Sequence, residues 1–203
     1  MYVARILYPV KVLGPGRRIG IWFCGCRRRC QGCSNPELWD FQKKYMTTVD
    51  VVVDLVRKIA HDNPIDGFTI TGGDPFEQPE ELADLLPFLR EISPDILIYT
   101  GYKLSELECR FPSIISLISV IVDGEYVEEL NKGSILRGSD NQVVHVINTD
   151  YKKIYDCYLN NSCNEIQNFI SSEGIISVGI HRTGFEQNFN EVLSTKGLEI
   201  KNE

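Results

Sequence analysis

Residues 18–36 read RIGIWFCGCRRRCQGCSNP, and this stretch decides the fold. Its first part, residues 18–23, is a short apolar run of the kind that forms a buried β-strand. In parallel α/β proteins, the loops that follow the strands carry the chemistry. The stretch therefore predicts a buried strand that delivers a ligand loop to the functional edge of a parallel sheet. Four cysteines crowd this loop within ten residues: Cys24, Cys26, Cys30 and Cys33.

The last three of these cysteines have the spacing C-x3-C-x2-C, which suits an iron–sulfur cluster. Four-iron clusters normally have four cysteine ligands, so three thiolates would leave one iron open to another ligand. Zinc is an alternative, because Cys24 supplies a fourth thiolate that would complete a tetrahedral site. Zinc ribbons, however, usually pair two C-x2-C motifs that lie far apart in the sequence. Cysteines that bind no metal are the third alternative.

On both sides of this stretch, apolar runs alternate with segments of helical periodicity, at spacings of roughly thirty residues. This alternation is typical of right-handed βαβ units and a parallel sheet. A complete eight-fold barrel usually needs about 250 residues, and the chain has 203. We therefore expect a single α/β domain over residues 1–203, folded as a partial (β/α)6-type open barrel. The expected strands are 3–10, 18–23, 67–71, 95–100, 116–122, 142–148 and 174–181, and the expected helices are 49–61, 79–92, 104–110, 154–171 and 185–196.

Composition excludes several classes of protein. With 21 basic and 28 acidic residues the net charge is −7, which argues against bulk attraction to nucleic acid or to an anionic membrane. No run approaches the ~18 apolar residues of a membrane-spanning helix, and residues 1–18 lack a signal-peptide cleavage site. Seven cysteines, four of them clustered, do not resemble a secreted disulfide framework. We expect a cytoplasmic protein in which the scattered Cys109, Cys157 and Cys163 are small, buried or half-buried hydrophobic side chains.

Further motifs appear in a fixed order around the cysteine loop, over about residues 10–148. They resemble the radical S-adenosylmethionine (SAM) activating enzymes, and most closely those that activate anaerobic ribonucleotide reductases. Residues from about 151 to 203 match this pattern poorly, and Ser34 stands where the family commonly has histidine. The motifs are Gly14-Pro15-Gly16-Arg17, Asn35-Pro36-Glu37-x-Trp39, Thr71-Gly72-Gly73-Asp74-Pro75, Tyr99-Thr100-Gly101-Tyr102, Val122-Asp123-Gly124-x-Tyr126 and Arg137-Gly138-Ser139-x-Asn141-Gln142.

The resemblance implies a [4Fe-4S] cluster on Cys26, Cys30 and Cys33, with SAM bound at the open iron. One electron would cleave SAM to methionine and a 5′-deoxyadenosyl radical, which would take a hydrogen atom from a backbone glycine of an anaerobic ribonucleotide reductase. The cofactor would carry this chemistry, so no catalytic side chain is expected beyond the cluster. A flavodoxin or ferredoxin would supply the electron, and neither nucleic acid nor a membrane is an expected partner. The alternatives are another glycyl-radical enzyme or a peptide as the substrate, or a non-catalytic zinc or iron–sulfur interaction module.

Six residues are expected to bind SAM. Gly72, Gly73 and Asp74 follow a strand, where paired glycines let the backbone approach the methionyl ammonium closely; a helix N-cap is the alternative role for Asp74. Asp123 follows another strand, with a solvated turn as its alternative. The remaining two are Arg137, for a bidentate pair with the SAM carboxylate, and Ser139. Ser139, together with Asn141 and Gln142, would contact the ribose or the substrate backbone. Asn148 and His181 are weaker candidates for contacts of the same kind. The radical SAM interpretation also requires Cys24 to point away from the cluster, because a fourth thiolate would close the site.

Overall fold

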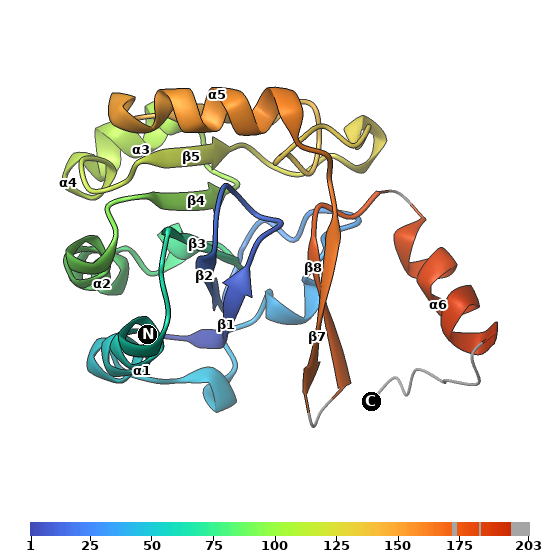
Figure 1. The fold of residues 1–203 in the computed structure, drawn as a ribbon, viewed down its shortest axis with the longest axis horizontal. Helices are drawn as coiled ribbons and strands as arrows, with labels where there is room; N and C mark the ends of the chain where they lie inside the picture. The colour runs from blue at the N-terminus through green and yellow to red at the C-terminus, as the bar shows by residue number, and fades with distance from the viewer. Residues whose placement is uncertain (172–173, 183, 196–203) are drawn as a thin grey trace.

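A mixed, mostly parallel sheet of six strands forms the centre of the computed structural model, which describes residues 1–171, 174–182 and 184–195. The strand order follows the chain, and the sheet curves without closing (Figure 1). The four central strands are parallel, whereas each edge strand is antiparallel to its neighbour. This sheet confirms the α/β class and the partial open barrel. The strands are β1 (Val3–Val10), β2 (Arg18–Phe23), β3 (Gly67–Gly72), β4 (Ile96–Thr100), β5 (Val120–Asp123) and β6 (Val143–Val146).

Four helices cover one face of the sheet. They are α1 (Val49–Asp62), α2 (Pro79–Ile92), α3 (Leu104–Arg110) and α4 (Pro112–Ile115). The Thr48 side chain caps α1 by accepting a hydrogen bond from the Val51 amide at 3.3 Å. Proline begins α2, and two acidic residues occupy its first turn, where the helix dipole favours them. Their apolar sides and the facing sheet residues form the largest buried core.

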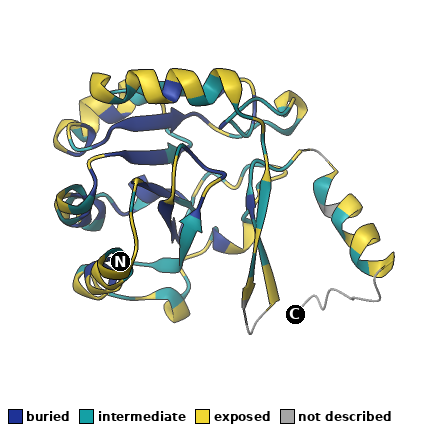
Figure 2. Cartoon of the chain, in the orientation of Figure 1, coloured by how far each residue is buried: buried dark blue, intermediate teal, exposed yellow. Residues whose placement is uncertain are grey.

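The opposite face is covered by the C-terminal quarter of the chain. Helix α5 (Lys152–Asn161) lies along β5, and the hairpin of β7 (Ile166–Ser171) and β8 (Gly174–Gly179) stands beside β1 and β2, with α6 (Phe185–Thr195) beyond it (Figure 1). Alternation along β5 shows the two faces, because Ile121 belongs to the core under the helices while Val120 and Val122 pack with Tyr155 of α5. Figure 2 shows the central strands as buried and much of α5 and α6 as exposed.

A buried ion pair fixes the amino-terminal ends of β2 and β4. Arg18 is fully buried and donates from Nη1 to Asp95 Oδ2 at 2.7 Å and from Nε to Thr69 Oγ1 at 2.8 Å. Tyr155 of α5 donates its hydroxyl hydrogen to Asp95 Oδ1 at 2.8 Å. Burial of both charges is compensated by this hydrogen bonding, so the pair ties α5 to the sheet.

The prediction of a helix over residues 154–171 was wrong in its second half. Helix α5 ends at Asn161, and residues 166–171 form β7, because their pairing with β8 and the packing of Phe169 on the core outweigh local helical periodicity. The strand expected over residues 174–181 forms in this hairpin, outside the main sheet. The expected strand 116–122 begins only at Val120, because residues before it complete the turn after α4.

The remaining expected elements appear within a few residues of their predicted bounds. The last helix is observed over Phe185–Thr195, and Lys196, which was expected to end it, lies outside the described residues. Among the helices that the structure describes, none is both long enough and apolar enough to cross a bilayer.

Candidate metal centre and cofactor pocket

A cavity of about 180 Å³ lies at the carboxyl ends of the parallel strands. Loops after β2, β3, β4 and β5 contribute to it, as does the end of β8. Parallel α/β proteins place their active sites at this edge. The lining includes, from the β2 loop, Cys26, Arg28, Cys30 and Cys33; from the next three loops, Gly72, Gly73, Asp74, Thr100, Gly101 and Gly124; and from the end of β8 and the two residues after it, Ser177, Val178, Gly179, Ile180 and His181.

The cysteine loop is held in place by its own backbone. The Gly25 amide donates to Leu38 O at 2.8 Å, and the Cys26 amide donates to Trp39 O at 2.8 Å. Gly25 has φ of 110°, and a Cβ there would lie 2.3 Å from the Phe41 ring, so only glycine fits this turn. The loop thus presents Cys26, Cys30 and Cys33, all partly buried, on the cavity lining.

Cys24 lies apart from these three thiols. Its side chain is fully buried, its S–H group donates to Asp40 O at 2.9 Å, and it does not line the cavity. Over the described residues, no three His, Cys, Asp or Glu side chains converge on a single ion position. A zinc site needs four ligand atoms around one point, whereas a cuboidal cluster binds each thiolate at a different iron. Since Cys24 is bonded to Asp40 O and lies off the lining, the thiols at the cavity are Cys26, Cys30 and Cys33, the three that a [4Fe-4S] cluster with one open iron would use.

Burial raises the pKa of the Cys26 and Cys33 thiols above the ordinary cysteine value. Metal ligation requires thiolates. Binding of a cluster at this loop must therefore release protons.

The paired glycines bring the end of β3 against the cysteine loop. The Gly73 amide donates to Phe23 O at 2.8 Å, and the Asp74 amide donates to Gly25 O at 2.8 Å. Gly72 has φ of 107°, and a Cβ on Gly73 would lie 2.3 Å from Gly25 O. Any side chain at these positions would push the two loops apart. The glycines therefore set the spacing between the cysteine loop and β3 and expose backbone to the cavity.

Asp74 caps the short 3-10 helix that follows it, as its alternative role predicted. Its Oδ1 accepts from the Phe76 amide at 3.1 Å, and its Oδ2 accepts from the Gly101 amide at 2.9 Å. The Thr100 hydroxyl lies 3.0 Å from Oδ1. Burial raises the pKa of this carboxyl to about 6, although these hydrogen bonds and nearby Arg28 oppose the rise. Asp74 thus joins the ends of β3 and β4 at the cavity.

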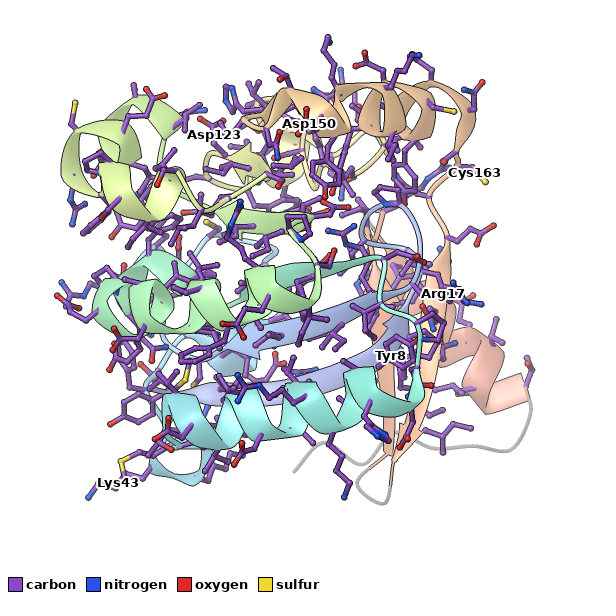
Figure 3. The ribbon with its side chains drawn as sticks, turned by 60° about the vertical axis from the view of Figure 1, so that its left-hand side comes forward. Tyr8, Arg17, Lys43, Asp123, Asp150 and Cys163 are labelled. Carbon is purple, nitrogen blue, oxygen red and sulfur yellow. The ribbon has the colours of Figure 1, made fainter. Side chains whose placement is uncertain are left out.

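The structure places Asp123 away from the cavity lining. Its position in β5 matches that of Ile121, on the face covered by helices, and Figure 3 shows it near α3. Its Oδ2 accepts from the Leu104 amide at 2.8 Å, and His145 Nε2 and Lys103 Nζ lie 3.3 Å and 3.6 Å from its carboxylate oxygens. Asp123 therefore holds the start of α3.

The segment from Arg137 to Gln142 shapes the loop after β5. Gln142 accepts from the Gly138 amide at 2.8 Å and donates to Gly124 O at 2.8 Å. Ser139 is buried and accepts from the Val127 amide at 3.1 Å, while Arg137 donates to Gln142 O at 3.3 Å. Of the four candidates in this segment, Gln142 reaches the lining, whereas Arg137, Ser139 and Asn141 do not. Arg137 and Ser139 support the loop behind the lining. Asn141 likewise donates to the Glu125 carbonyl at 2.8 Å.

The structure places the two weaker candidates, Asn148 and His181, in different parts of the molecule. Asn148 caps the short helix at residues 149–151, and it lies at the opposite edge of the sheet because β6 is antiparallel to β5. His181 lines the cavity, where its ring stacks on Phe185 with centroids 4.1 Å apart. The expectation that Cys109, Cys157 and Cys163 are buried or half-buried was wrong, because all three are exposed. Cys109 and Cys157 lie on the solvent sides of α3 and α5, and Cys163 lies on the outside between α5 and β7 (Figure 3).

The sequence did not identify the role of the three arginines between Cys26 and Cys30. Arg27 Nε lies 3.1 Å from Glu77 Oε2, Arg28 pairs with Glu125, and Arg29 pairs with Asp40. Each arginine thus binds a carboxylate from a different segment. The run of three basic residues marks the position of these ion pairs in the sequence. The local pattern does not identify their carboxylate partners, because each partner lies in another segment.

Comparison with known proteins agrees with this donor set. Residues 12–145 match a family described as a 4Fe-4S single cluster domain. The chain is 35% identical over 147 residues to the anaerobic ribonucleoside-triphosphate reductase-activating protein of Escherichia coli K12, an alignment that covers 68% of this chain and 94% of that protein. It is 33% identical over 141 residues to the protein of that name from bacteriophage T4, covering 67% and 88%.

A shorter similarity extends to a second kind of activating enzyme. The chain is 38% identical over 80 residues to the pyruvate formate-lyase-activating enzyme of Clostridium pasteurianum, covering 38% of this chain and 34% of that enzyme.

Proposed function

This chain belongs to the family of the anaerobic ribonucleoside-triphosphate reductase-activating proteins, and from this premise we propose that it generates a glycyl radical on an anaerobic ribonucleotide reductase. It is a radical SAM activating enzyme, with a [4Fe-4S] cluster and SAM as its cofactors. One observation carries the proposal most strongly. Three cysteines of one loop line the cavity, while Cys24 is buried and hydrogen-bonded elsewhere.

In the proposed mechanism, Cys26, Cys30 and Cys33, which line the cavity, would hold the cluster beside the space for SAM. When bound, the cluster and SAM would supply the radical chemistry for removal of a hydrogen atom from the substrate glycine. The protein contributes position and enclosure. The tight contact of Gly73 with the cysteine loop keeps the ligand-bearing loop fixed against the end of β3.

We further propose that the backbone at Gly72 and Gly73 and the carboxylate of Asp74 receive the amino group of SAM. Asp74 is suited to this role because it lines the cavity and its position is fixed by amide and hydroxyl donors. For Asp123, Arg137 and Ser139 we propose a supporting role, since their hydrogen bonds are directed into the loops behind the lining. A flavodoxin or ferredoxin as electron donor and a cytoplasmic location remain part of this proposal.

The test is reconstitution without oxygen, followed by reduction with SAM and an anaerobic ribonucleotide reductase from the same genome. We expect a glycyl radical by electron paramagnetic resonance (EPR) on the reductase, together with 5′-deoxyadenosine. Replacement of the reductase by pyruvate formate-lyase is the matched control, because the similarity to its activating enzyme covers only 38% of this chain. A radical on the lyase alone would assign the chain to the second substrate. Tight zinc binding through four cysteines, with no SAM cleavage, would support a non-catalytic interaction module and reject the enzyme.

A further inference from the structure

The C-terminal hairpin forms one wall of the cavity. The matched family region ends at residue 145, and β7, β8 and α6 all follow it. Five consecutive residues from the end of β8, Ser177 to His181, line the same cavity as the three cysteines. A part of the chain that lies beyond the matched domain therefore shapes the space next to the reacting centre.

This wall is firmly attached to the barrel. Gln167 of β7 donates to Pro9 O at 2.6 Å and accepts from the Lys11 amide at 3.0 Å, which joins the hairpin to the end of β1. Val178 is 3% exposed and packs in the core that contains Trp22. The hairpin is therefore packed against the barrel as an integral part of the site.

A second set of contacts joins the wall to the loop after β5. Asn131 donates to His181 O at 2.8 Å. Asn164, just before β7, donates to Gly133 O at 2.9 Å and to Ser134 O at 3.0 Å. The wall is therefore fixed to the barrel at both of its sides.

The residues of the wall suit the binding of a polypeptide backbone. None of the five residues from Ser177 to His181 carries a fixed charge. In the part of the chain that the structure describes, β8 pairs only with β7, so its other edge takes part in no ladder. His181 Nε2 is buried and has no hydrogen-bond partner among the described residues. An unpaired strand edge binds an extended peptide through main-chain hydrogen bonds, whereas the charged amino-acid end of SAM needs charged partners.

We propose that the Ser177–His181 wall receives the glycine-bearing segment of the protein substrate, which lies along the wall in extended form and faces the three cysteines. This inference rests on the proposed function and adds the surface that selects the substrate. The occupant is the substrate polypeptide because the wall shares one cavity with the cluster ligands, so whatever lies on it adjoins the centre at which hydrogen is removed.

The experiment compares two isoleucines of the same hairpin. Ile180→Arg places bulk and charge on the wall, and Ile170→Arg places the same side chain on β7 at a position that is 88% exposed and off the lining. Each reconstituted variant is assayed twice. The first assay measures the glycyl-radical yield against reductase concentration and gives the KM for the reductase. The second measures the 5′-deoxyadenosine formed without reductase, and so tests whether SAM still binds and is cleaved.

We expect Ile180→Arg to raise the KM for the reductase at least tenfold, a larger factor than any decrease in SAM cleavage, and Ile170→Arg to match the wild type. His181→Ala is the second wall variant, with an expected fivefold or greater rise in KM, and it carries the test if Ile180→Arg does not fold. An unchanged KM in the wall variants overturns the inference. So does a loss of SAM cleavage that parallels the loss of glycyl radical, because the wall would then hold SAM. If the wild type cleaves SAM but forms no radical on the reductase, the proposed function fails and the inference fails with it.

Discussion

The guanidinium carbon of Arg28 lies 4.2 Å from the centroid of the Tyr102 ring. Arg28 stands midway between Cys26 and Cys30, and Tyr102 follows the end of β4, so this cation–π contact links the cysteine loop to a neighbouring strand. A Cβ on Gly101 would lie 2.2 Å from Arg28 Cδ, which shows how closely the arginine stem passes the backbone.

A second contact strengthens the same link. Tyr102 donates its hydroxyl hydrogen to Glu77 Oε1 at 2.9 Å, and the other carboxylate oxygen of Glu77 lies 3.1 Å from Arg27 Nε. The cysteine loop is therefore attached to the ends of both β3 and β4 through Tyr102. These contacts hold the proposed cluster-binding loop in position.

Arg28→Ala should loosen the cysteine loop while leaving its three thiols in place. The lost cation–π contact is worth about 1 kcal/mol, and the Glu125 ion pair is lost with it. We expect the reconstituted variant to lose iron to a chelator at least fivefold faster than the wild type. Arg29→Ala is the matched control, because Arg29 pairs with Asp40 and its side chain is about half exposed. Equal rates of iron loss in the two variants would contradict the positioning role of Arg28.

Replacement by alanine should abolish cluster binding at Cys30 and leave it nearly unchanged at Cys24. Cys30→Ala removes a proposed ligand, so reconstituted protein should bind less than a quarter of the wild-type iron and cleave no SAM. Cys24→Ala removes a buried thiol, which costs about 1 kcal/mol of folding stability through the small cavity it leaves, but iron content and SAM cleavage should remain near wild type. Iron and sulfide analysis with EPR of the reduced protein measures both. Loss of the cluster in Cys24→Ala would show that Cys24 is a ligand.

Asp74 should lower the stability of the cluster-free protein as pH rises. Its pKa is about 6 in the folded chain, against an ordinary 3.8. Between these values the folded chain binds more protons than the unfolded chain, so the free energy of unfolding falls as pH rises. The penalty is absent below the unfolded pKa and complete above the folded one, where it amounts to about 3 kcal/mol.

Urea unfolding of wild type and Asp74→Asn at several pH values between 4 and 7 tests this. Asparagine does not ionise, so the variant should gain stability relative to the wild type progressively as pH rises through this range. Its lost hydrogen bonds add an offset that does not depend on pH. A difference between the two proteins that stays constant across the range would show that the Asp74 carboxyl titrates normally in the folded chain.

The sequence predicted the barrel and the cysteine loop because both depend on local pattern. The strand 18–23 is apolar throughout, and a cysteine loop that follows such a strand belongs at one edge of a parallel sheet. Asp123 shows the limit of this reasoning. It follows an apolar run and precedes a glycine, as a ligand residue would, but its side chain faces the helices. Alternation separates the two faces of β5, yet it does not say which face borders the cavity.

The C-terminal part could not be predicted for a related reason. The direction of β6 decides that Asn148 lies away from the cavity, and no local signal gives the direction of a strand. The segment 166–171 is a strand only because β8 pairs with it, and β8 is placed by contacts of Gln167 with residues more than 150 positions away. Contacts over such separations determine which residues face the cavity, and local pattern does not encode them.

The Arg18–Asp95 pair supports a prediction about stability. Asp95→Ala leaves a fully buried guanidinium without its carboxylate and removes the acceptor of the Tyr155 hydroxyl. Removing one partner of a buried pair typically costs 3–5 kcal/mol, and we expect a loss of about that size in urea unfolding. The exposed pair Arg57–Glu91, with 3.4 Å between its charged atoms, provides the control.

Glu91→Ala should cost less than about 1 kcal/mol, because solvent screens that pair. Tyr155→Phe should cost about 1 kcal/mol, since it removes one hydrogen bond and leaves the ion pair intact. This order, with Asp95→Ala far above the other two, follows from burial: only in the first variant does a charge remain in the interior without a counter-charge. If Asp95→Ala and Tyr155→Phe cost the same, the carboxylate would contribute only as a hydrogen-bond acceptor, and α5 rather than the charge pair would hold this end of the sheet.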